Sequence, residues 1–111
     1  MLYLYLMTNN NELTKQLIKD HVEHLKQLDA ENKLVLCGSF HDYPGDMVVF
    51  NADCYDQAIL IAESDPFIHS GCKTYELRCL EVANQDNHYL LLGCKGINSP
   101  FDGWSSKCLA F

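Results

Sequence analysis

Two residues, His21 and Asp65, have the types and positions that acid–base chemistry needs. His21 lies four residues after Leu17 and four before Leu25, a spacing that places all three side chains on the inward face of one helix. An imidazole on that face must find a hydrogen-bond partner or stay neutral and desolvated. His21 is therefore a candidate general acid–base group, and a satisfied core histidine is the alternative interpretation.

Asp65 precedes Pro66 where a second helix is expected to end. The pair is typical of a helix stop, because the residue before a proline avoids the helical region. An acidic side chain there would face the negative end of the helix dipole, which carries a modest energetic cost. A cationic or hydrogen-bond-donating partner would offset that cost, and His21 suits Asp65 chemically as this partner.

Gly38, Ser39 and Phe40 follow the second expected strand, where they place a small hydroxyl beside a permissive backbone. A ligand-binding loop and a simple turn are both consistent with this pattern. Phe40, Phe67 and Tyr5 would suit an aromatic or cyclic ligand. The chain contains Ser, His and Asp but no nucleophile-elbow pattern, so a hydrolase triad is disfavoured.

His24 borders the same helix face as His21 and is expected to contact the substrate with Gly38, Ser39, Phe40 and Phe67. Its H-x-x-H spacing from His21 is a weak metal signal. The six cysteines form no C-x-x-C pair, which argues against a zinc ribbon or a thioredoxin-type motif. We therefore expect no metal site and no cofactor, and mostly free, structural thiols.

The charge balance excludes several classes of partner. Eight Lys and Arg residues against fifteen Asp and Glu residues give a formal net charge of −7, which disfavours binding to nucleic acid or to an anionic membrane surface. No apolar run approaches the roughly 20 residues of a membrane span. The apolar run 1–7 has no preceding positive charges, so a signal peptide is not expected. We expect a cytoplasmic protein.

The hydrophobic pattern predicts six elements in residues 2–83. They are a strand at 2–7, a helix at 12–31, strands at 34–37 and 47–50, a helix at 54–64 with Asp53 as its N-cap, and a strand at 74–82. This β-α-β-β-α-β order is typical of the α+β ferredoxin-like fold, a split βαβ with an antiparallel sheet and both helices on one face. The other face is also apolar, which predicts a homodimer with face-to-face sheets.

Residues 84–111 differ in composition and form a C-terminal extension to the domain at 1–83. Glycines and prolines are frequent there, but apolar anchors such as Phe101 and Trp104 make the segment too apolar for a disordered tail. We expect this extension to dock on the domain or on a partner subunit, where it could also support a higher oligomer.

Three motifs together resemble the YciI-like (YCII-related) family over residues 2 to about 83. They are His21 followed by helix leucines, a strand that ends in Gly38, and an Asp-Pro-Phe block that begins at Asp65 and is followed by Gly71. The resemblance implies the fold of the dimeric α/β barrels. It also implies that His21 and Asp65 form an active-site dyad in a pocket between sheet and helices.

The chain departs from the family pattern at two positions, and the substrate is not implied. Ile18 stands where arginine is frequent, and Ser39 stands where proline is common. We expect an acid–base enzyme that acts by isomerisation, elimination or lactone-type chemistry on a small molecule, with cyclic and aromatic molecules as candidates. The alternatives are a non-catalytic dimer that binds a small molecule or regulates a partner, and a structural assembly module.

Overall fold

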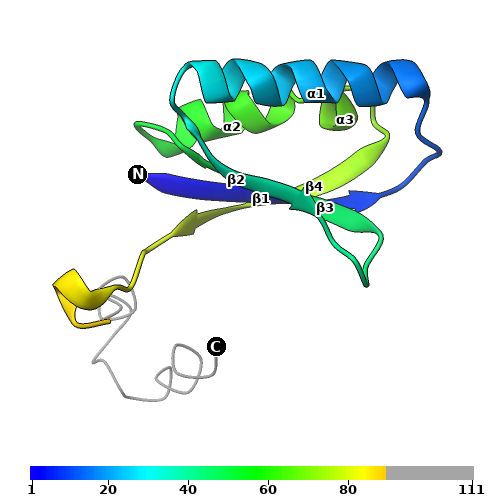
Figure 1. Cartoon of the computed structure of the whole chain (residues 1–111). Helices are drawn as coiled ribbons and strands as arrows, with labels where there is room; N and C mark the ends of the chain where they lie inside the picture. Colours follow the sequence, from blue (N-terminus) through cyan, green and yellow to red (C-terminus); the bar gives the residue numbers. More distant parts are fainter. Residues whose placement is uncertain (90–111) are drawn as a thin grey trace. The chain divides into compact units, whose positions relative to one another are not determined.

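The elements follow the predicted β-α-β-β-α-β order, with one additional short helix. The computed structural model describes residues 1–89. Its elements are β1 (Leu2–Asn9), α1 (Lys15–Ala30), β2 (Leu34–Ser39), β3 (Gly45–Asn51), α2 (Tyr55–Glu63), α3 (Pro66–His69) and β4 (Lys73–Leu80) (Figure 1). All of them belong to a first compact unit that ends at Leu80, and a second unit begins at Glu81.

The four strands form one antiparallel sheet in the order β2-β3-β1-β4. Tyr5 of β1 lies opposite Val48 of β3 and Leu77 of β4. Residues directly opposite each other in a sheet point to the same face, so these three side chains share the face toward the helices. The predicted α+β fold with an antiparallel sheet is confirmed.

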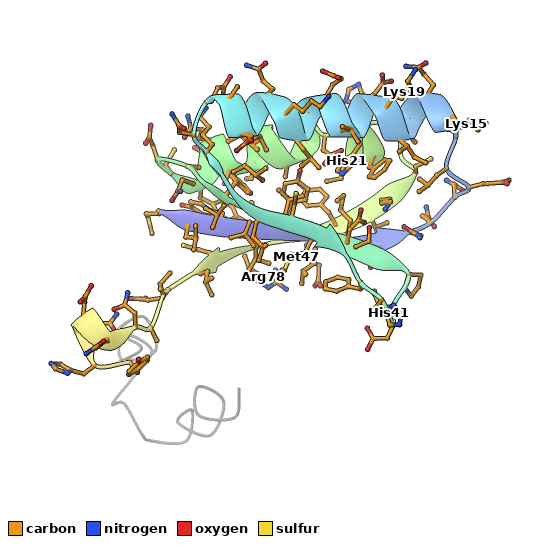
Figure 2. All side chains as sticks on the ribbon, viewed as in Figure 1. Lys15, Lys19, His21, His41, Met47 and Arg78 are labelled. Atoms are coloured by element: carbon orange, nitrogen blue, oxygen red, sulfur yellow. The ribbon has the colours of Figure 1, made fainter. Side chains whose placement is uncertain are left out.

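The hydrophobic core lies between this sheet face and the helices, which all cover the same side (Figure 1). In β1 the side chains of Tyr3, Tyr5 and Met7 are buried, while Leu4 and Leu6 between them are only partly buried. This period of two is what a strand with one covered face requires. Figure 2 shows His21 pointing from α1 into the same space. The helices contribute Leu28, Ala58, Ala62 and Phe67 to the core.

The first two helices begin slightly later than predicted. Thr14 caps α1, because its side chain accepts a hydrogen bond from the Leu17 backbone N–H at 3.1 Å. The N-cap residue of α2 is Cys54, which makes no side-chain capping bond, so the prediction of Asp53 as the N-cap is wrong. The backbone N–H of Asp53 is instead bound by the Gln57 side chain at 2.7 Å.

Asp65 begins a helix rather than ending one. Helix α2 stops at Glu63, and Asp65 is the N-cap of α3, where its side chain accepts a hydrogen bond from the Phe67 backbone N–H at 3.0 Å. Pro66 suits the first helical position, because no intrahelical partner exists there for an N–H. The expectation that Asp65 faces the negative end of a helix is therefore wrong, since an acid at an N-cap faces the positive end.

The second face of the sheet carries no helix of the first unit (Figure 1). Leu4, Val49 and Leu36 form one row across three strands on this face. Leu36, in the outermost of these strands, is 59% exposed. This face is therefore apolar along this row, as the sequence predicted, while β4 adds Arg78 opposite Leu4 and Glu76 opposite Leu6.

The described part of the second unit is short. Asn84 starts a 3₁₀ turn over Gln85–Asn87, and the side chains of Asn84 and Asn87 each accept a hydrogen bond from the other's backbone N–H. The predictions for the rest of the extension, including its anchors Phe101 and Trp104, fall on residues 90–111 and lie outside the described residues.

Candidate active site

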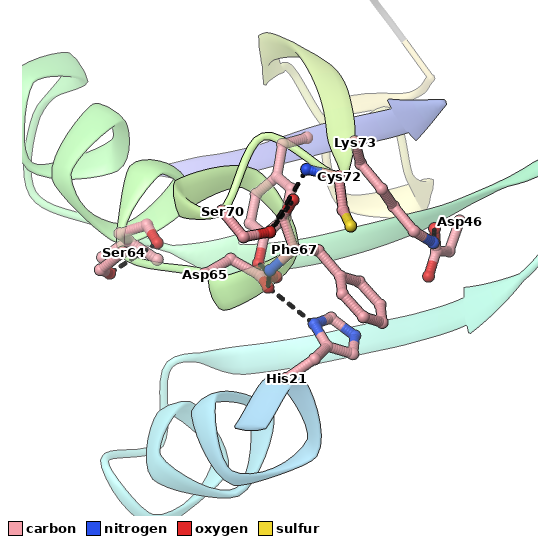
Figure 3. A network of polar contacts seen from close by, with 10 residues as sticks. His21, Asp46, Ser64, Asp65, Phe67, Ser70, Cys72 and Lys73 are labelled. Carbon is pink, nitrogen blue, oxygen red and sulfur yellow. Dashed lines mark hydrogen bonds and ion pairs between the residues drawn. The ribbon is translucent and has the colours of Figure 1, made fainter. Parts of the chain in front are cut away.

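His21 of α1 and Asp65 at the start of α3 meet in the core (Figure 3). The His21 Nδ1 lies 2.8 Å from the Asp65 Oδ1, which is a normal hydrogen-bond distance. His21 is 7% exposed and Asp65 is 0% exposed, so water is kept from this contact. The predicted meeting of the two side chains is confirmed, although the N-cap of α3 provides the acid.

Three elements hold the Asp65 carboxylate in place. Besides the contact with His21, its Oδ1 accepts a hydrogen bond from the Phe67 backbone N–H at 3.0 Å, and its Oδ2 accepts one from the Tyr5 hydroxyl of β1 at 2.7 Å. A buried carboxylate needs several such donors, because burial without them is costly. Tyr5 was expected to line the ligand site. Its hydroxyl instead binds Asp65, and Tyr5 is not one of the residues that line the pocket next to His21.

These contacts favour the ionised form of Asp65. Burial acts to raise the pKa of this carboxyl, but the hydrogen bonds from His21 and Tyr5, the charge of His21 and the Phe67 backbone N–H hold its pKa below the ordinary 3.8. Burial, reinforced by Asp65, raises the pKa of the Tyr5 hydroxyl, which remains a donor. A carboxylate at Nδ1 keeps the proton of a neutral imidazole on that nitrogen, so Nε2 is the acceptor.

We expect acid to remove the stabilisation that the Asp65 charge provides. The pKa of Asp65 in the folded protein lies below 3.8, so its stabilisation is complete above the unfolded-state pKa and is lost as pH falls through the folded-state value. In urea unfolding, the stability difference between the wild type and Asp65→Asn should shrink as the pH falls below about 4.

Asp42→Asn is the matched control for this titration, because Asp42 is exposed in the loop after β2. This variant should unfold like the wild type at each pH. A difference between wild type and Asp65→Asn that stays constant as the solution is acidified to about pH 2 would contradict an ionised Asp65.

His21 also lines a pocket of about 340 Å³ between α1 and the sheet. Gly38, Ser39 and Phe67, which were predicted to surround a ligand, line the same pocket. The rest of its wall comes from Leu13, Ile18, Val22, Leu25, Cys37, Asp46, Met47, Val48 and Lys73. Because Nδ1 is bonded to Asp65, Nε2 is the ring nitrogen available to a molecule in this pocket.

Sequence reasoning missed a buried ion pair in the pocket wall (Figure 3). The Lys73 Nζ lies 2.6 Å from the Asp46 Oδ1 and 4.2 Å from the centroid of the Phe67 ring. The same ring stacks on His21, with the centroids 3.9 Å apart. A signal for Asp46 existed: it lies two residues before the apolar Val48, and strand alternation places both on one face.

Phe40 is not brought to this pocket. It lines a separate hollow of about 280 Å³ with residues that include Leu6, Tyr43 and Glu76. Phe40 follows Ser39 directly, and successive side chains along an extended chain point to opposite faces. The alternation that directs Ser39 to the helix side therefore directs Phe40 away from it.

His24 also lies outside the pocket wall. It is half-buried on α1, one turn beyond His21, on the side of Leu28. Burial lowers the pKa of His24, while the charge of Asp65 opposes that shift. Its buried Nε2 has no hydrogen-bond partner in the part of the chain that the structure describes.

Residues 1–89 contain no group of three or more His, Cys, Asp or Glu side chains arranged to hold a metal ion. The four cysteines in this range are free thiols, and Cys54 and Cys79 are exposed. None of the described helices is long and apolar enough to cross a membrane.

Comparison with known proteins finds relatives in sequence and in fold. The YCII-related domain matches residues 1–81. The uncharacterized protein YjpA of Bacillus subtilis (strain 168) is 33% identical over 69 residues, which cover 62% of this chain and 81% of YjpA.

Two solved structures share the fold at low sequence identity. The 5-chloro-2-hydroxyhydroquinone dehydrochlorinase TftG of Burkholderia phenoliruptrix AC1100, in complex with 2,5-dihydroxybenzoquinone, has a TM-score of 0.61 at 20% identity, covering 78% of this chain and 99% of TftG. Muconolactone isomerase has a TM-score of 0.61 at 17% identity, covering 72% of this chain and 88% of the isomerase. Both comparisons agree with the dimeric α/β-barrel type of fold.

Proposed function

Because the chain belongs to the YCII-related domain family, whose pattern spans residues 1–81, we propose that it is an acid–base enzyme. His21 would move a proton on a small molecule held in the pocket. The observation that carries this proposal is the 2.8 Å contact between a fully buried Asp65 and the Nδ1 of a pocket-lining His21. An imidazole oriented in this way presents Nε2 to the pocket as a proton acceptor.

The reaction classes that fit best are isomerisation and elimination, because both can begin when a base removes a proton from carbon. The fold relatives support this choice, since one is by name a dehydrochlorinase and the other an isomerase. In each reaction Nε2 accepts the proton of a C–H bond. In an isomerisation, Nε2 then returns the proton to another carbon. In an elimination, the leaving group departs with the electron pair of the bond that breaks.

A screen of small lactones and hydroxyquinones tests the proposal. Each compound is incubated with the protein in D₂O, and NMR records C–H to C–D exchange and new products. We expect exchange or turnover of at least one compound, and loss of both in His21→Asn. A compound that binds in the pocket without either signal would favour the alternative, a non-catalytic dimer that binds a small molecule or regulates a partner.

We also propose that a second copy of the chain covers the uncovered sheet face. The row of Leu4, Val49 and Leu36 gives this face an apolar centre, with Leu36 59% exposed at its end, and exposed apolar side chains on an uncovered face often mark an interface. A face-to-face dimer should bury roughly 1,600 Å² in total.

Leu36→Lys should weaken this dimer, because Leu36 is 59% exposed on the row and a lysine there would place a charge in the interface. Light scattering should give twice the chain mass for the wild type and a shift toward the single-chain mass for the variant. Leu60→Lys is the control, since Leu60 is 69% exposed on α2, away from the row. A monomeric wild type at micromolar concentration would contradict the proposal.

A further inference from the structure

The ion pair of Lys73 and Asp46 is a second polar centre in the pocket that the proton transfer at His21 does not use. Lys73 is 5% exposed and Asp46 is 7% exposed, and both line the pocket. Lysine is almost never buried to this degree unless it is paired. A buried pair is also often no better for stability than apolar residues of similar size, so stability alone does not account for it.

The Lys73 ammonium has donors left over for a ligand. It carries three N–H bonds, and Asp46 is its only hydrogen-bond acceptor among residues 1–89. The face of the Phe67 ring lies on another side of Nζ, 4.2 Å from it. At least one N–H is therefore free to bind an oxygen atom of a molecule in the pocket.

The positions of Lys73 and His21 relative to each other suit a small ring. Both contact Phe67, at 4.2 Å for the Lys73 Nζ and 3.9 Å for the His21 ring. The distance from Nζ to the centre of the imidazole ring is therefore no greater than the sum of these two distances. The Phe67 ring lies between the two groups (Figure 3), so a ligand that reaches both must pass the edge of this ring, as a six-membered or five-membered ring with one exocyclic oxygen can.

We propose that Lys73 binds a carbonyl oxygen of the substrate and that the substrate is a small cyclic carbonyl compound. This inference rests on the proposed function. When Nε2 of His21 takes the proton, the C–H electron pair moves toward the carbonyl, and C=O becomes the C–O⁻ of an enolate. The Lys73 ammonium donates a hydrogen bond to that oxyanion and stabilises it. Asp46 positions Lys73 and partly neutralises it.

The test uses 4-nitrophenolate as a stand-in for the enolate and 4-nitroanisole as its neutral counterpart. Affinities are measured by calorimetry, and the absorbance band of the phenolate reports its ionisation when bound. We expect wild type to bind 4-nitrophenolate about tenfold or more tightly than 4-nitroanisole, which is the effect of one charge-assisted hydrogen bond. Equal affinities, or no binding of either probe, would overturn the inference.

Variants of the pair should move this preference in opposite directions. Lys73→Met should abolish it, and Asp46→Asn should increase it, because an unneutralised Lys73 attracts the anion more strongly. A purely structural pair would show neither change. If Lys73→Met does not fold, the double variant K73M/D46L replaces the whole pair with apolar side chains and should also show no preference.

Lys19→Met is the control, because Lys19 is exposed on the outer side of α1 (Figure 2) and should leave the preference unchanged. His21→Asn should keep the preference, since the charge that creates it belongs to Lys73. Loss of the preference while turnover still requires His21 would overturn only this inference. Turnover that survives His21→Asn with the preference intact would overturn only the proposed function.

Discussion

His21→Asn should lower the rate of proton transfer at least about a hundredfold, because a positioned acid–base group contributes roughly 10²–10⁴ to a rate. Asparagine is planar and polar like imidazole but has no nitrogen that can act as a base at neutral pH. The fold and the pocket should survive, because the remaining wall residues are unchanged. The measurement is C–H to C–D exchange or turnover of any compound that the wild type processes, with binding measured in parallel.

His41→Asn is the matched control for this substitution. His41 is exposed at the tip of the loop between β2 and β3, away from α1 (Figure 2). Its replacement should change neither exchange nor binding. An His21→Asn protein that retains near wild-type turnover would remove the acid–base role and return His21 to an ordinary core histidine.

Asp65→Ala should lower the free energy of unfolding by about 3–5 kcal/mol, because each buried donor left without its acceptor costs roughly 1–3 kcal/mol. The substitution leaves three donors without their acceptor, namely His21, the Tyr5 hydroxyl and the Phe67 backbone N–H. It also removes the N-cap of α3, which contributes about 1 kcal/mol in typical helices. Urea unfolding of the wild type and the variant measures the difference.

Asp65→Asn separates the two roles of this residue. Asparagine is as good an N-cap as aspartate, so this variant should be more stable than Asp65→Ala. It has no charge to hold the proton on Nδ1 of His21, so ¹⁵N NMR of the imidazole should show a mixed tautomer population and turnover should fall. Equal stabilities of the two variants would show that α3 does not depend on the cap.

The arrangement of the sheet could be predicted because local patterns agree with it. Buried and partly buried side chains alternate along β1, and the leucines around His21 repeat at helical spacing. The sequence therefore predicts both elements and their buried faces. The contact between His21 and Asp65 could also be predicted from the sequence. A histidine on the inward face of a helix needs a hydrogen-bond partner, and an acid at a helix end suits that role.

The rest of the site depends on contacts that local patterns do not contain. Lys73 and Asp46 belong to different strands that are not neighbours in the sheet, so the pattern of neither strand contains their contact. Asp65 was misread for a related reason. An Asp-Pro pair ends one helix or begins another, and the choice depends on whether the next residues find room to form a turn.

A relative of this chain that kept the fold without the proposed proton transfer would be free to change His21 long before Asp65. Loss of the imidazole removes one donor from a carboxylate that keeps two others, from Tyr5 and from the Phe67 backbone. Loss of the carboxylate removes the start of α3 as well. After gene duplication, the acid should therefore persist in copies that keep only the fold, and among relatives the histidine is the better marker of the proposed proton transfer.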